Sequence, residues 1–369
     1  MSGPDGMAAQ PGGRARGSSS GAMARLTGLA KKPAPSHHRN GHSPRDEEFS
    51  DMSRYGPGER RDSAEQVVAP QARPDSYYGR PVIKEPVWRS PEVPGYLFLG
   101  GLAGASSVLA ACAQGTGNRE LARASKAAAA AAIGLSLAAL VADLGRPARF
   151  LNMLRVFKVT SPMSIGSWLV SGYTPAAAAA AASALTGRMP RVGAAASGAA
   201  AVLGAGVATY TAALVTDTAV PAWHEGHREM PYLFAGSAAT AAGGLGMLAV
   251  GQPAAAQAVR FAVLGSAAEL TAKSLLLQRL DDVAQPYRSG RAGKLMEAAE
   301  VLTAAGLTGA VLGSRNRAAA AVSGAALLTA SALTRFGIFF AGRASARDPA
   351  YTVAPQRQRL PETASADAR

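Results

Sequence analysis

The sequence predicts an all-α integral membrane protein, a bundle of eight transmembrane helices with disordered polar tails. A helix crosses the bilayer core with about 20 apolar residues, and the middle of this chain is a series of such segments rich in Ala, Gly, Leu and Val. The segments are apolar on every side, whereas helices of a soluble bundle carry a polar face. Basic residues gather in the tails and in the loops between segments, which is typical of membrane topology rather than of nucleic-acid binding.

Composition divides the 369 residues into four parts. Residues 1–75 are polar and rich in Gly, Pro and Ser, which predicts a disordered N-terminal tail. Residues 76–93 interleave aromatic and branched side chains with prolines, which disfavours a helix and predicts an extended docking or interfacial arm. Residues 94–341 form the transmembrane domain, and residues 342–369 form a polar C-terminal tail.

Eight segments of the transmembrane domain are long and apolar enough to cross a bilayer. They are 94–113, 125–143, 161–186, 192–216, 231–251, 254–278, 295–314 and 317–341. Ser161-Pro162 is typical of a helix start, and the many small residues predict close approach of the helix backbones in lipid. An even number of spans places both termini on one side, and the richer positive charge of that side predicts the cytoplasm.

Cysteine and histidine are placed in a way that bears on redox cofactors. The one cysteine, Cys112, cannot supply an iron–sulfur motif, and no histidine lies in an apolar segment where it could ligate a haem. His224 and His227 share a loop with Glu225, but this is a weak pattern for a metal site. We therefore expect neither haem, nor iron–sulfur cluster, nor metal ion in this chain.

A few polar residues within or beside the apolar segments are candidate functional residues, because lipid makes their burial costly. Tyr96 and Tyr210 could each hold a quinone carbonyl by a hydrogen bond, or could simply pack with a locally satisfied hydroxyl. Asp143 ends the second segment. Glu269 is the most deeply placed acid, and Lys273 lies one helical turn further on. The two could form a self-neutralising pair, or Glu269 could handle protons.

Three stretches carry a family resemblance. "PGYLFLGGLAGASS", "DLGRPARFLNMLRVFKVTSPMSIGSW" and "TDTAVPAW" resemble segments of the NrfD/polysulfide reductase membrane-subunit family, also called the PsrC type, and the resemblance covers about residues 77–341. It implies an eight-helix, haem-free subunit of a bacterial plasma membrane that binds menaquinone or ubiquinone. It also implies a ferredoxin-like, four-cluster iron–sulfur partner and, through that partner, a molybdopterin catalytic subunit.

The same resemblance implies a quinone site. A polar side chain early in the first helix and a tyrosine on the fourth helix line that site in the family, and they correspond to Tyr96 and Tyr210. The first is a departure, because a described family member has histidine there. We expect Asp143, Arg146 and Trp223 to complete the quinone site, with Asp143 or Glu269 as the proton-linked acid. The residues expected to dock the partner are Tyr77, Tyr78, Trp88 and Arg149.

Other interpretations remain open at this point. Trp88 and Tyr96 could anchor the first helix at the level of the lipid headgroups. A secondary transporter or proton channel would be favoured by inverted repeats and interrupted helices, and Pro175 supplies one such break. The chain could also be a structural anchor that has lost quinone binding.

Overall fold

The computed structural model describes residues 82–144, 148–312, 316–353 and 355. All of them lie in the compact unit Ala69–Arg369, and the predicted tail 1–75 lies outside them. No strand occurs in these ranges. The long helices are α2 (Glu92–Gly115), α3 (Arg119–Leu144), α5 (Pro162–Thr186), α6 (Pro190–Thr216), α8 (Met230–Ala249), α9 (Ala255–Arg279), α11 (Gly290–Leu312) and α12 (Arg317–Arg347). The short ones are α4 (Ala148–Met153), α7 (Pro221–His224), η2 (Asp281–Ala284) and α10 (Gln285–Arg288).

The eight long helices coincide with the eight predicted segments to within six residues at either end, and the all-α membrane fold is confirmed. Within the described ranges, six of them are long and apolar enough to cross a membrane, so a count of eight crossings is not confirmed. The other two are α5 and α9. Ser, Thr, Tyr and Pro residues dilute the apolar character of α5, whereas α9 carries Arg260, Glu269 and Lys273. The helix α5 continues through Pro175 without interruption.

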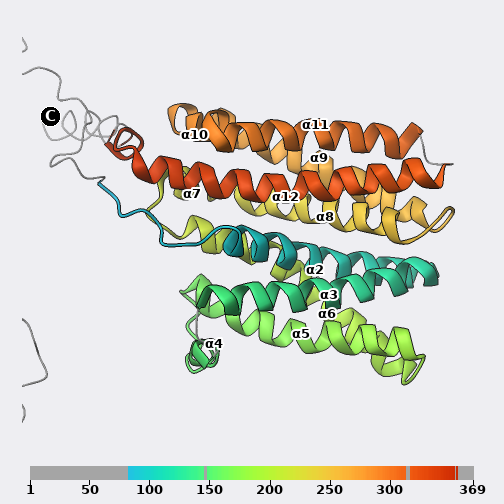
Figure 1. The fold of residues 1–369 in the computed structure, drawn as a ribbon. Helices are drawn as coiled ribbons and strands as arrows, with labels where there is room; N and C mark the ends of the chain where they lie inside the picture. The colour runs from blue at the N-terminus through green and yellow to red at the C-terminus, as the bar shows by residue number, and fades with distance from the viewer. Residues whose placement is uncertain (1–81, 145–147, 313–315, 354, 356–369) are drawn as a thin grey trace, which may run out of the picture. The chain divides into compact units, whose positions relative to one another are not determined.

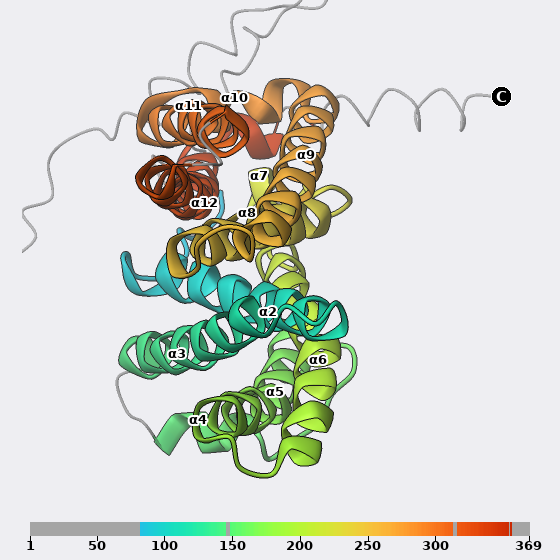
Figure 2. The same ribbon diagram turned by 90° about the vertical axis from the view of Figure 1, so that its right-hand side faces the viewer.

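The long helices lie side by side in two groups (Figures 1 and 2). The first group contains α2, α3, α5 and α6, and the second group contains α8, α9, α11 and α12. The groups meet where α2 and α6 pack against α8 and where α2 touches α12. Small residues make such packing close, as predicted. A Cβ atom added to Gly104 of α2 would lie only 2.2 Å from the carbonyl oxygen of Gly204 on α6.

The arm that precedes α2 is tied to the end of α12. Glu85 accepts hydrogen bonds from Arg343 Nε at 2.6 Å and from Arg347 Nη2 at 2.9 Å. The bond from Arg347, together with the charge of Arg343, lowers the pKa of the Glu85 carboxyl. The start of α2 and the end of α12 therefore lie at one end of the helices, which we call the arm end, and the opposite end is the far end. The helix α12 runs to Arg347, six residues beyond the predicted boundary at 341.

Candidate functional site

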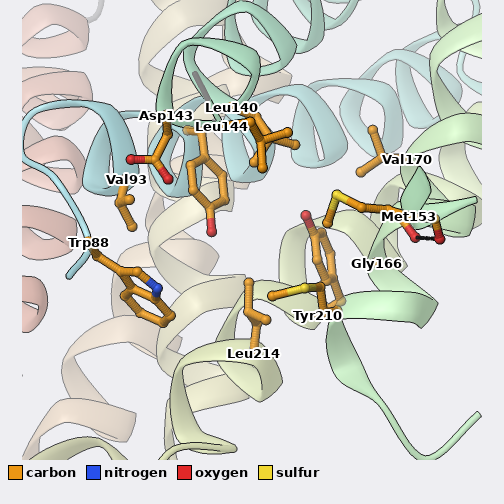
Figure 3. A pocket seen from close by; sticks show the side chains of 13 residues that line it. Trp88, Val93, Leu140, Asp143, Leu144, Met153, Gly166, Val170, Tyr210 and Leu214 are labelled. Atoms are coloured by element: carbon orange, nitrogen blue, oxygen red, sulfur yellow. Dashed lines mark hydrogen bonds between the residues drawn. The ribbon is translucent and has the colours of Figure 1, made fainter. Parts of the chain in front are cut away.

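A cavity of about 130 Å³ lies at the arm end of the first group (Figure 3). It is enclosed by α2, α3, α4, α5 and α6, and the arm adds one wall. The residues that line it are Trp88, Val93, Tyr96, Leu140, Asp143, Leu144, Met153, Met163, Gly166, Ser167, Val170, Tyr210 and Leu214. Most of this surface is apolar, with a few polar groups that converge on one space, which is the usual character of a small-molecule site.

Two tyrosines with unpaired hydroxyls approach this cavity. Tyr96 comes from α2 and Tyr210 from α6, and neither hydroxyl bonds to any residue that the structure describes. Tyr173, in the apolar core of the same group, differs: its hydroxyl donates to Ala103 O at 2.6 Å and lies 2.8 Å from Ser107 Oγ. Both residues line the cavity, so their free hydroxyls are available to hydrogen-bond a molecule that enters it.

A glycine on α5 makes room for one of these tyrosines. A Cβ atom added to Gly166 would lie 2.2 Å from the ring of Tyr210. Any larger residue at this position would push the ring out of place. Gly166 is therefore a positioning residue that the sequence analysis did not name. Its only signal was a glycine in the first turns of a predicted helix, and nothing in the sequence says which ring lies opposite.

Asp143 also lines the cavity, from the last turn of α3, where its side chain is half-buried. Figure 3 shows its carboxylate on the same side as Trp88 and Val93, with Tyr210 across from them. The cavity thus brings together three of the five residues predicted for the quinone site: Tyr96, Tyr210 and Asp143. Arg146 lies outside the described residues.

Arg149 and the two tyrosines of the arm were predicted to dock a partner. Arg149 is exposed on α4, and its Nη1 donates to the carbonyl oxygen of Leu144 at 3.2 Å, which caps the end of α3. Tyr77 and Tyr78 fall outside the described residues. Their docking role therefore stays a prediction.

The two tryptophans predicted for this region pack on each other. The rings of Trp88 and Trp223 stack with centroids 5.2 Å apart and an angle of 22° between their planes. Trp223 is fully buried, and its Nε1 donates to Ile338 O at 2.8 Å. Trp223 therefore does not line the cavity but supports Trp88, which does. Trp88 was predicted as a docking residue, and the structure adds a place for it in the cavity wall.

Glu269 lies apart from the cavity, buried in the second group. Its Oε1 accepts a hydrogen bond from Thr334 Oγ1 at 2.8 Å, and its Oε2 has no hydrogen-bond partner in the described ranges. The salt bridge of Lys273 goes to Glu300 on α11, at 2.6 Å, instead of to Glu269. The self-neutralising pair considered from the spacing on α9 is thus replaced by a contact between helices.

A buried arginine next to Thr334 completes this region. Arg335 is almost fully buried, its Nη2 donates to Phe234 O at 2.7 Å, and its guanidinium lies 3.7 Å from the centroid of the Phe234 ring. We call Glu269, Lys273, Glu300, Thr334 and Arg335 the charged cluster. The packing of Arg335 against Phe234 depends on the fold and leaves no signal in the sequence.

The histidine loop offers little for a metal ion. Nδ1 of His224 lies 3.2 Å from Thr216 O, and Nδ1 of His227 lies 3.0 Å from His224 O. Among residues 82–353 that the structure describes, no three His, Cys, Asp or Glu side chains gather into a metal-binding group.

Residues 83–257 match the family model described as polysulphide reductase, NrfD. The match begins in the arm, includes α2 to α8 and ends in the first turn of α9. It thus contains every residue that lines the cavity, and it confirms the resemblance carried by the three sequence stretches. No curated protein matches the chain.

Proposed function

With residues 83–257 matched to the NrfD family, we propose that this chain is the haem-free, quinone-reactive membrane subunit of a molybdopterin/iron–sulfur oxidoreductase complex. The match to that family supports a membrane subunit of a polysulfide reductase-like oxidoreductase. In the proposed complex, which could be of the polysulfide reductase or formate dehydrogenase type, the chain exchanges electrons between a ferredoxin-like iron–sulfur partner and menaquinone or ubiquinone. The molybdopterin subunit would contact the iron–sulfur partner.

One observation carries the proposal: two unpaired tyrosine hydroxyls on different helices meet in a mostly apolar cavity. A cavity of roughly 150 Å³ can hold a benzene ring, so the volume of about 130 Å³ suits one ring of a quinone, with the remainder leaving through the open mouth. Tyr96 and Tyr210 would each donate a hydrogen bond to a quinone oxygen. The ring of Trp88 and the apolar side chains would exclude water from its faces.

Protons would be handled at the cavity by Asp143. Reduction of a quinone takes up protons as well as electrons, and a tyrosine hydroxyl is too weak an acid to supply them near neutral pH. Among the described residues that line the cavity, Asp143 is the one carboxylate, and it lies at the arm end, where water can reach it. Glu269, the other acid predicted to be proton-linked, does not line this cavity. It could therefore take part in proton transfer to the quinone only through other groups.

Electrons would enter or leave at the arm end. We propose that the iron–sulfur partner docks there, with the arm and Arg149 as part of its contact surface. The rich positive charge of this end predicts that it faces the cytoplasm. A reporter fused to the C-terminus tests that side, and a reporter that is active only outside the cytoplasm contradicts it.

The quinone site is tested by turnover of the purified complex with a quinone. Tyr96→Phe and Tyr210→Phe should each raise the KM for quinone about 10-fold, because each removes one hydrogen bond to the ligand and leaves the fold intact. Tyr232→Phe is the control, because Tyr232 is 70% exposed. Unchanged kinetics in both cavity variants contradict the site. Solute uptake by the chain alone in proteoliposomes would support the transporter instead.

A further inference from the structure

A second cavity, of about 470 Å³, lies at the far end, away from the proposed quinone site. It opens where α3 begins and where α5 and α8 end. Arg119, Glu120 and Arg123 line it from the first turns of α3, Leu185 from α5, and Val250 from the end of α8. Two of these helices, α3 and α8, are among the six apolar enough to cross a membrane. Because the ends of membrane-crossing helices lie near the lipid headgroups, this cavity would lie at the headgroup level.

The charge around this cavity is strongly one-sided. Within the described residues, the helix ends and loops 113–128, 185–192, 249–256 and 316–320 contain one acid, Glu120. The same stretches contain six basic residues: Arg119, Arg123, Lys126, Arg188, Arg191 and Arg317. An anion at this end of the bundle would therefore be attracted from several sides.

Hydrogen bonds to backbone carbonyl oxygens fix the helix ends beside this cavity. Arg317 caps α8 by donating from Nη1 to Met247 O at 2.7 Å. Asn118 fixes the turn before α3 by donating to Ala254 O at 2.9 Å. Within the described part of the chain, the guanidinium of Arg123 makes one long hydrogen bond, to Leu185 O at 3.4 Å.

Arg119 completes the cationic mouth of the cavity. It begins α3, where the unpaired N–H groups of a helix add positive potential. Its side chain makes no hydrogen bond to a described residue and is exposed. Two guanidinium groups at the mouth are thus available to a ligand.

We propose that this far-end cavity binds the phosphate headgroup of an anionic phospholipid. Arg119 and Arg123 would hold the phosphate, because guanidinium groups bind phosphate oxygens in a bidentate manner. The exposed side of Leu185 and the alanines of α3 would contact the acyl chains. An anionic lipid is favoured over a neutral one because of the excess of basic residues, and a lipid over free phosphate because the wall below the arginines is apolar. The inference does not depend on the quinone site.

Native mass spectrometry of the full chain in detergent, titrated with phosphatidylglycerol, tests the site. The wild type should bind one lipid saturably. Arg119→Gln/Arg123→Gln should weaken that binding by about 10-fold or more, since each basic group near the headgroup attracts an anionic lipid. Arg188→Gln/Arg191→Gln removes the same charge from the same end but outside the cavity, and it should change the affinity by less than about 3-fold. Arg119→Lys/Arg123→Lys keeps the charge but loses the bidentate geometry, so its affinity should fall between those of the wild type and the Gln pair. An unchanged melting temperature of the Gln pair excludes misfolding as the cause.

Three results would overturn the proposal. Equal losses in the two Gln pairs would mean that charge at this end acts without a defined site. Equal binding of phosphatidylcholine would remove the preference for an anionic headgroup. Displacement of the lipid by inorganic phosphate at millimolar concentration would make the ligand a free phosphate.

Discussion

The two helix groups use their buried polar side chains differently. In the first group, the hydroxyls of Tyr96 and Tyr210 face a cavity and have no partner among the described residues. In the second group, Thr334 and Lys273 use their polar atoms to join one helix to another. Both groups are built from the same small, apolar residues, so composition does not separate them. Unpaired atoms also occur in the second group, at Glu269 Oε2 and at Arg335 Nε and Nη1, in the part of the chain that the structure describes. The comparison teaches that the cavity separates the groups, because the free hydroxyls of the first group line a space that a ligand can enter.

The largest effect is expected in the charged cluster. Arg335→Met removes the donor to Phe234 O and the positive charge nearest to Glu269, so stability should fall by about 3 kcal/mol. Denaturant titration of the purified chain measures this loss. Arg260→Met, at an exposed arginine of α9, is the control and should cost little. If folded Arg335→Met binds a quinone analogue more weakly than the wild type, this would contradict the assignment of ligand binding to the first group and of packing to the second.

Two tyrosines of the first group should show opposite effects when each is changed to phenylalanine. Tyr210→Phe should reduce the affinity for a quinone analogue about 10-fold with unchanged stability, because its hydroxyl has no protein partner. Tyr173→Phe should leave the affinity unchanged and lower stability by about 1–2 kcal/mol, because Ser107 Oγ and Ala103 O lose their partner. Analogue titration and thermal unfolding measure the two effects. Equal phenotypes in the two variants would contradict the distinction between ligand-facing and packing hydroxyls.

A smaller effect is expected from the arm. Trp88→Ala removes an aromatic wall of the cavity and should weaken analogue binding by about 5-fold, in line with the value of an aromatic contact. The neighbouring Val87→Ala is the matched control, because Val87 is 79% exposed. The same titration compares them. An affinity that is equal in the two variants would mean that the arm does not form part of the site.

The smallest effect concerns pH. Glu229, just before α8, accepts a hydrogen bond from Arg279 Nε at 2.6 Å, and this bond holds the pKa of its carboxyl below the usual 4.5. The pair should therefore stabilise the second group fully above pH 4.5 and lose this contribution as the pH falls through the lowered pKa. Glu229→Gln should lower the melting temperature slightly at pH 7, and the difference from wild type should shrink below pH 4.5. A difference that grows on acidification would contradict the sign.

Much of the fold could be read from the sequence, because long apolar segments and proline-marked starts predict helices locally. Tyr96, Tyr210 and Asp143 could be named because polar residues in lipid are rare and because the motifs resemble a family. Gly166 could not, since the ring that it accommodates comes from another helix.

Contacts between side chains of different helices were the second feature that the sequence could not predict. The spacing on α9 suggested a contact between Glu269 and Lys273, but Glu300 reaches Lys273 from α11. The place of Trp88 in the cavity wall likewise depends on Trp223, which lies far along the chain. Such contacts depend on how helices pack and leave no periodic signal within one segment.

The most direct test of the account is photolabelling with an azido-quinone, followed by peptide mapping of the full chain. The account predicts label on the cavity walls of α3, α5 and α6, near Leu140, Val170 and Leu214, and loss of this label when unmodified quinone is added in excess. The double variant Tyr96→Phe/Tyr210→Phe should reduce the labelling. Competable label confined to α9, α11 or α12 would contradict a quinone site in the first group.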